Sequence, residues 1–161
     1  MGASLSDDCP AVWQPVGTVV KLHLGVMDIP YDDGKETTGE VASFLEERYS
    51  VMQRFFDAHE RDIIKLMEDS IAGSLENIMA GAPPAKDPFA EAMSEVHNLF
   101  IFFITNKKLD GNDGIPTMAS LLGISRRLKN KRGPPRPSFL DTGLYIASMR
   151  AWVSEVMNAE H

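Results

Sequence analysis

The residues with the clearest chemical potential lie near the C-terminal end, where Asp141, Thr142 and Gly143 follow Phe139 and Leu140. In aspartic peptidases, two such carboxylates from two halves or two subunits share one proton. A peptidase built on this motif would therefore be a homodimer. Three-residue motifs also arise often by chance, and in many chains this one is only a turn.

The surrounding sequence favours a structural role for the motif. Aspartic peptidases are built almost wholly of strands, whereas most of this chain has helical periodicity, and Leu144 stands where a small residue is usual. The apolar-apolar-glycine segment 121–123 precedes the motif instead of following it. We expect Asp141 to cap a helix by accepting from the amide of Gly143 or Leu144, with Gly143 permitting a tight entry. We predict no catalytic residue.

Other constellations that could hold a metal or a nucleophile are incomplete. The turn 110–114 is rich in Asp, Asn and Gly, but its glycine comes one place early for a calcium loop and Leu121 occupies the twelfth position. No serine lies in a Gly-x-Ser-x-Gly frame. No metal-binding spacing joins the four histidines, which are His23, His59, His97 and His161. We expect no metal and no cofactor.

A basic segment precedes the motif. Within eleven residues that contain no acid lie Arg126, Arg127, Lys129, Lys131, Arg132 and Arg136. The net charge is −7, and outside this segment 10 basic residues face 23 acidic ones, which disfavours general binding to nucleic acid. No aromatic residue interleaves the segment for base stacking. A contact with an acidic protein surface is favoured, and a nucleic-acid module is the alternative.

The elements that position these residues begin with a strand over 18–27, where Leu22 and Leu24 alternate with Lys21 and His23. A loop over 28–39 follows. Thr37 and Glu40 then have the spacing of a capping box and predict the start of a long helix.

The long helix has apolar positions from Val41 to Ile78, Phe44 among them, at a period near 3.6 residues. Gly81 and the two prolines that follow it end this pattern. About 40 residues would extend on the order of 60 Å, longer than a compact domain of this size is wide. The helix must therefore kink, near Gly73, or project. A projecting helix buries its apolar stripe against another chain, which predicts homo-oligomerisation.

A second helix should open at Asp87 with Pro88 in its first turn and end near Asn106. Short helical pieces at 117–122 and 125–130 lead to a proline-rich arm over 131–140, which we expect to be extended. The fold class is α+β and helix-rich, with the long amphipathic helix packed on a small antiparallel sheet.

The termini and the number of domains complete this outline. The last element, 142–157, fits either a helix or a strand, and for 149–161 the choice stays open. Residues 1–17 are expected to be flexible, and residues 1–161 form one domain. Truncation at Pro135 is expected to leave a folded chain that cannot assemble.

Composition sets the broad class. The chain has 161 residues, of which 43% are hydrophobic and 24% charged, as in ordinary globular proteins. Cys9 is the single cysteine, so an intramolecular disulfide is impossible and a reducing compartment is expected. No apolar run approaches the roughly 18 residues of a membrane span.

The final stretch resembles a known signature. "PSFLDTGLYIASMRAWV", residues 137–153, is similar to the C-terminal signature of the tail-completion or neck proteins of long-tailed bacteriophages, including the minor tail protein Z type of lambda-like phages and the virion morphogenesis proteins of Mu-like phages. Residues 37–84 also resemble the long helix of such proteins. The matching positions of the signature are Asp141, Thr142, Gly143, Leu144 and Ser148, with Arg136 and Pro137 just ahead.

The resemblance implies a structural protein of the virion, assembled in the bacterial cytoplasm as a ring that joins the connector to the tail. DNA would pass through its lumen without specific binding, and no catalysis or membrane contact is implied. The Asp-Thr-Gly motif would be the hinge of a docking element, and residues 126–140, with Phe139, would contact a neighbouring subunit or ring. A tail terminator, a capsid-side connector and a homodimeric aspartic peptidase using Asp141 are the alternatives.

Overall fold

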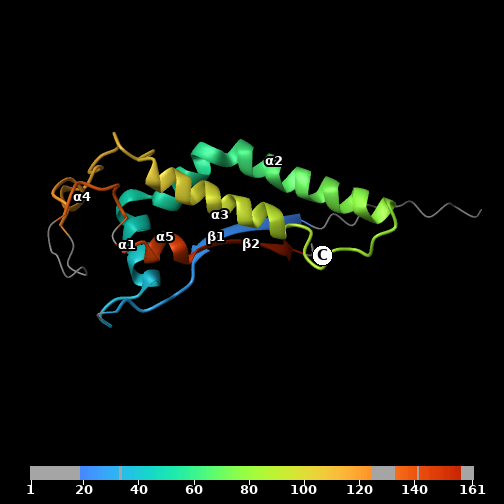
Figure 1. The fold of residues 1–161 in the computed structure, drawn as a ribbon, viewed down its shortest axis with the longest axis horizontal. Coiled ribbons are helices and arrows are strands. Elements are labelled where there is room, and N and C mark those ends of the chain that lie inside the picture. Colours follow the sequence, from blue (N-terminus) through green and yellow to red (C-terminus); the bar gives the residue numbers. More distant parts are fainter. Residues whose placement is uncertain (1–18, 33, 125–132, 141, 157–161) are drawn as a thin grey trace, which may run out of the picture.

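A computed structural model describes residues 19–32, 34–124, 133–140 and 142–156. In chain order, its elements are β1 (Val19–Val26), α1 (Thr38–Tyr49), α2 (Val51–Met79), α3 (Ala90–Thr105), α4 (Met118–Leu121), α5 (Leu144–Ser148) and β2 (Met149–Val156) (Figure 1). The expectations for residues 1–17, 125–130 and 157–161 lie outside the described residues.

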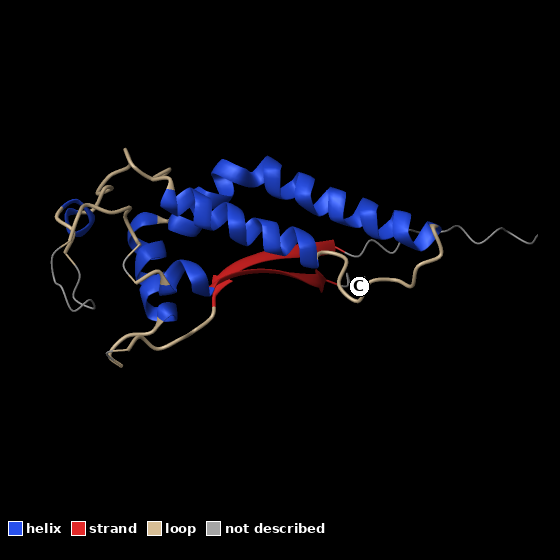
Figure 2. Cartoon of the chain, viewed as in Figure 1, coloured by secondary structure: helices blue, strands red, loops and turns tan. Residues whose placement is uncertain are grey.

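The two strands form an antiparallel sheet, and the helices gather over one of its faces (Figure 2). Helix α3 packs on the sheet, and α2 packs on α3. Helices α1 and α5 lie together where the two strands meet the rest of the chain (Figure 1). The α+β class with a small antiparallel sheet is confirmed, although the helix that covers the sheet is α3 and the longest helix forms the next layer.

The sheet register puts Leu22 opposite Val153 and Leu24 opposite Ala151, and all four side chains pack against the core. On the other face, the indole of Trp152 is 47% exposed and stacks on His23 with ring centroids 5.3 Å apart. The alternation in the sequence therefore predicted the buried face of β1 correctly. The ambiguous C-terminal segment divides into one short helix, α5, and one strand, β2.

The core lies between α2, α3 and the C-terminal elements. Phe55 meets Phe100 edge-on at 5.2 Å between ring centroids, and Phe100 meets Tyr145 at 6.1 Å. Met149 at the start of β2 is fully buried. Truncation at Pro135 would remove Tyr145, Met149 and half of the sheet, so we expect the shortened chain to be much less stable than the full chain.

The long helix is divided at Ser50, which adopts a left-handed conformation with φ of 50°. The Glu46 carboxylate accepts hydrogen bonds from the amides of Met52 at 2.7 Å and Gln53 at 3.2 Å, and so satisfies free donors in the first turn of α2. The predicted capping box at the start of α1 is confirmed, since Thr37 and Glu40 bond each other's amides. Of the two alternatives for the long helix, a kink near Gly73 or a projecting helix, the kink is wrong, because α2 continues through Gly73.

Helix α3 begins later than predicted. Asp87 accepts from the amide of Phe89 at 2.9 Å, but it does so in a turn, and the helix starts at Ala90. The hydroxyl of Ser70 donates to the carbonyl of Pro88 at 2.6 Å and marks where the chain returns to α2. The C-terminal end of α2 extends past α3 and the two strands (Figure 1).

Candidate functional site: a groove between α1 and the proline-rich arm

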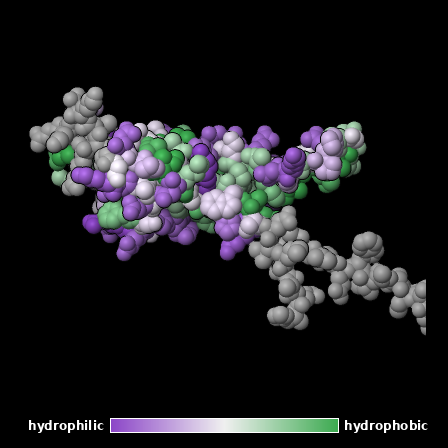
Figure 3. All heavy atoms as spheres, turned by 90° about the horizontal axis from the view of Figure 1, so that it is seen from below, coloured by the Kyte–Doolittle hydropathy of each residue, from purple (hydrophilic) through white to green (hydrophobic). Residues whose placement is uncertain are grey.

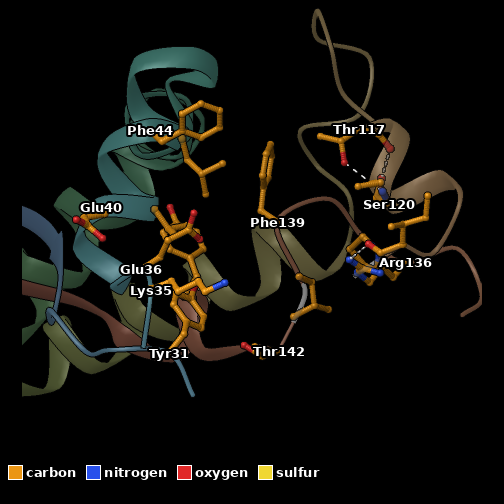
Figure 4. Close-up of a pocket in the computed structure, with 18 residues that line it drawn as sticks. Tyr31, Lys35, Glu36, Glu40, Phe44, Thr117, Ser120, Arg136, Phe139 and Thr142 are labelled. Carbon is orange, nitrogen blue, oxygen red and sulfur yellow. Dashed lines mark hydrogen bonds between the residues drawn. The ribbon is translucent and has the colours of Figure 1, made fainter. Parts of the chain in front are cut away.

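An open groove of about 1100 Å³ lies between α1 and the segments that flank α4 and α5. We call it the arm groove. Its lining is mainly apolar with a polar rim (Figure 4). The lining residues are Tyr31, Lys35, Glu36, Glu40, Val41, Phe44, Leu45, Thr117, Ala119, Ser120, Ile124, Arg136, Pro137, Phe139, Leu140, Thr142, Gly143 and Tyr145.

The α1 side of the groove is fixed to the sheet through Thr38. This residue is fully buried, and its hydroxyl donates to the carbonyl of Met27 and accepts from the amide of Ile29 at 2.8 Å. The end of β1 and the start of α1 are thereby held together. About one and a half turns further along α1, Phe44 lines the groove, and its side chain is 55% exposed to solvent.

The opposite side is the proline-rich arm, which is tied to α4. The Ser120 and Ser138 hydroxyls lie 3.1 Å apart, and both side chains are buried. Ser138 also accepts from the amide of Thr117 at 3.1 Å. The Arg136 amide donates to the Ser120 carbonyl at 3.0 Å, and its guanidinium donates to the Ile124 carbonyl at 2.8 Å. The described part of the arm therefore follows α4 closely.

Phe139 lies near the end of the arm and occupies the middle of the groove (Figure 4). Its φ of 66° is a left-handed conformation that a non-glycine residue adopts only where its surroundings hold it there. The ring packs on Tyr49 with centroids 5.1 Å apart. Phe139 and the exposed Phe44 thus present two aromatic rings from opposite walls.

The floor of the groove includes Tyr145, which is buried between α1 and α3. Burial raises the pKa of its phenol well above the ordinary value, and the nearby Glu46 carboxylate and Tyr31 add to the effect. The phenol therefore stays neutral at physiological pH and gives the floor a hydroxyl without charge.

The structure brings several of the predicted site residues to this groove. Arg136, Pro137 and Phe139 line it from the arm, and Thr142 and Gly143 line it next to α5. Gly143 has φ of 81°, which favours glycine at the entry to α5. The hydroxyl of Thr142 lies 3.4 Å from the amide of Leu144, the first residue of that helix.

Other predicted residues lie elsewhere. Ser148 is buried, and its hydroxyl donates to the carbonyl of Tyr145 at 2.7 Å, so in this structure it stabilises the junction of α5 with β2 and does not reach the groove. Leu144 is half-buried. The predictions for Asp141 and for Arg126, Arg127, Lys129, Lys131 and Arg132 fall outside the described residues.

Sequence reasoning missed the α1 side of the groove. The helical period assigned Phe44 to the apolar stripe, yet its side chain is 55% exposed and lines the groove. Tyr31 lay in a segment predicted as a loop, yet its side chain is 6% exposed. A signal was present in the three aromatic residues Tyr31, Phe44 and Tyr49, which lie close to one another in the sequence.

Two features are absent from the residues that the structure describes. No cluster of three or more His, Cys, Asp or Glu side chains is arranged to hold a metal ion in that part of the chain. Within the same residues, no helix combines the length and the apolar character needed to cross a membrane.

The chain was compared with protein-family models, with curated proteins and with solved structures, and none of the three comparisons found a match.

Proposed function

We propose that the chain is a structural protein of a tailed bacteriophage virion, located at the head-tail junction. In this proposal it forms a homo-oligomeric ring that joins the connector to the tail, and the arm groove receives part of the neighbouring subunit. A tail terminator or a capsid-side connector is the alternative within the same class.

The observation that carries the proposal is the convergence of the two phage-like segments on one groove. The signature segment contributes Phe139, Thr142 and Gly143, and the helical segment contributes Phe44 from the other side. Phe44 is 55% exposed, and an aromatic side chain in an apolar groove is a typical anchor point of a protein interface. A peptide segment of another subunit fits such a groove better than a small polar substrate does.

The charge distribution supports a lumen that DNA crosses without sticking. The net charge of −7 repels a polyanion, and six of the 16 basic residues concentrate in the segment 126–136, which overlaps the arm. In the assembled ring we therefore assign the basic segment to contacts with acidic surfaces of neighbouring virion proteins.

The first test is a genetic one in the phage that encodes the chain. Without the gene, heads and tails should accumulate separately, and the wild-type protein should restore joining. Phe44→Asp should fail to restore joining while keeping the wild-type melting temperature. The matched control is Phe102→Asp on α3, a ring of similar exposure at 53% outside the groove, which should restore joining.

Electron microscopy of purified virions with a specific antibody gives an independent readout. Label at the neck supports the proposal, and label that is absent from virions defeats it. The aspartic peptidase alternative predicts cleavage of a peptide at acidic pH that is lost in Asp141→Asn. Such cleavage would replace the structural proposal with an enzymatic one.

A further inference from the structure

The sequence that precedes β1 has the composition of a peptide that binds an apolar groove. Residues 1–18 lie outside the described residues, and they contain two acids, Asp7 and Asp8, and no Lys or Arg. The acids are followed by the stretch 10–16, "PAVWQPV", in which every residue except Gln14 is apolar or proline. Trp13 stands at its centre. Prolines favour an extended peptide, and tryptophan is enriched among the residues that anchor interfaces.

The arm groove is complementary to this stretch in size and polarity. Its volume of about 1100 Å³ exceeds that of most small-molecule sites, which are about 300–1,000 Å³, so it has room for several residues of a peptide. Phe44 and Phe139 present aromatic rings from opposite walls. In the space-filling view, hydrophobic side chains lie among hydrophilic ones at the end of the molecule that carries α1 (Figure 3). An indole flanked by prolines matches such a surface.

The charges beside the two surfaces have opposite signs. Asp8 is two residues ahead of the stretch 10–16, whereas the segment 126–136 carries six basic residues and no acid, and its Arg136 lines the groove. Opposite charges steer an encounter between two surfaces and fix its register. The other long segments outside the described residues, 125–132 and 157–161, contain no aromatic residue. Residues 7–16 are therefore the part of the chain that fits the groove best.

Geometry prevents a chain from placing Trp13 in its own groove. Trp13 is six residues ahead of Val19, and six fully extended residues span at most about 22 Å. Strand β1 already extends about 23 Å from Val19 to Val26, at 3.3 Å per residue. The groove lies beyond the Val26 end, where α1 and α5 gather, so the stretch would also have to double back along the strand (Figure 1). The groove of a second copy is not subject to this limit.

We infer that residues 7–16 of one copy occupy the arm groove of a second copy, with Trp13 between Phe44 and Phe139. The inference rests on the proposed function, because it names the segment of the neighbouring subunit that the groove receives. Each copy gives one segment and receives another, which is a head-to-tail contact that closes into a ring when the rotation between subunits allows it. One short segment carries the contact, so we expect dissociation in the micromolar range.

The fluorescence of Trp13 reports the contact directly. The chain has two tryptophans, and Trp152→Phe leaves Trp13 as the only one. Trp152 is 47% exposed, so this background should fold. Trp13 emission of the full chain should move to shorter wavelength as the concentration rises through the range in which sedimentation velocity detects oligomers. Adding Phe44→Asp should abolish the shift, and Phe102→Asp, with similar exposure on α3, should leave it unchanged.

Two results of the fluorescence series would overturn the inference. Emission typical of a buried indole that does not change on dilution would place the segment within its own chain. Emission typical of an indole in water at every concentration would leave the groove to a different partner.

A peptide tests the same contact without the chain's own segment. The Trp13→Ala chain keeps its groove intact and should bind a fluorescein-labelled peptide of residues 5–17 saturably, as measured by anisotropy. A peptide with alanine at position 13 should bind at least tenfold more weakly, and Phe44→Asp in the chain should weaken the original peptide as much. Equal affinity of the two peptides would contradict the inference.

The inference and the proposed function can fail separately. If Trp13→Ala restores the joining of heads to tails while Phe44→Asp does not, the virion role stands and the groove receives another virion protein. If the peptide binds as expected but the antibody finds no label on virions, the exchange between copies stands and the virion role is defeated.

Discussion

Thr38 offers the sharpest test of how the arm groove is held to the sheet. Its buried hydroxyl donates to the carbonyl of Met27 and accepts from the amide of Ile29. Thr38→Val keeps the shape of the side chain but removes both bonds. Each group left without its partner costs about 1–3 kcal/mol, and the added methyl returns about 0.8 kcal/mol.

Ile29 is half-buried and the Met27 side chain is 48% exposed, so water can replace part of what is lost. We therefore expect the lower end of the range, about 2–3 kcal/mol, which corresponds to a melting temperature roughly 4–12 °C lower for a domain of this size. Thermal unfolding followed by circular dichroism measures it. Thr38→Ser is the control, because it keeps the hydroxyl and loses one methyl, at about 1 kcal/mol. If Thr38→Val were no less stable than Thr38→Ser, the hydrogen bonds would not be the anchor.

Three further predictions concern the α1 to α2 junction, the groove floor and the signature motif. Glu46→Ala should lower stability by about 1–2 kcal/mol in urea unfolding because two amides of α2 lose their acceptor, whereas the exposed neighbour variant Glu47→Ala should change little. Burial raises the pKa of Tyr145 above its ordinary value of 10.0, so the folded state keeps the phenol neutral and loses stability as pH rises above about 10. Tyr145→Phe should therefore show a smaller drop in melting temperature than the wild type between about pH 9 and pH 11. An equal drop in the two proteins would contradict this assignment. Asp141→Asn should preserve assembly better than Asp141→Leu, since an amide can cap a helix and leucine cannot; equal assembly would argue against capping.

The elements that the sequence predicted well are those with a strong local signal. The alternation around Leu22 and Leu24 identified the buried face of β1, and the Thr37 and Glu40 pair located the start of α1. Both signals depend on residues a few positions apart, because strand alternation and capping are local properties of the backbone.

The break at Ser50 shows why the rest could not be predicted. Serine is an ordinary helix residue, and the apolar period continues across this position, whereas Gly73 has the lower helix propensity. The break is instead favoured by Glu46, whose carboxylate reaches two amides of the next helix, and by the fully buried Val51 and Phe55. The Glu46 bonds are local, but Val51 and Phe55 are buried only when α2 packs in the core, and the energy of that burial exceeds a propensity difference of about 1 kcal/mol.

The same break determines the surface on which the proposed function depends. If α1 and α2 formed one straight helix, Phe44 and Ile64 would be separated by 20 residues, or about 30 Å, along a single axis. Because the chain turns at Ser50, α1 packs against α5 and forms one wall of the arm groove, while α2 packs along α3.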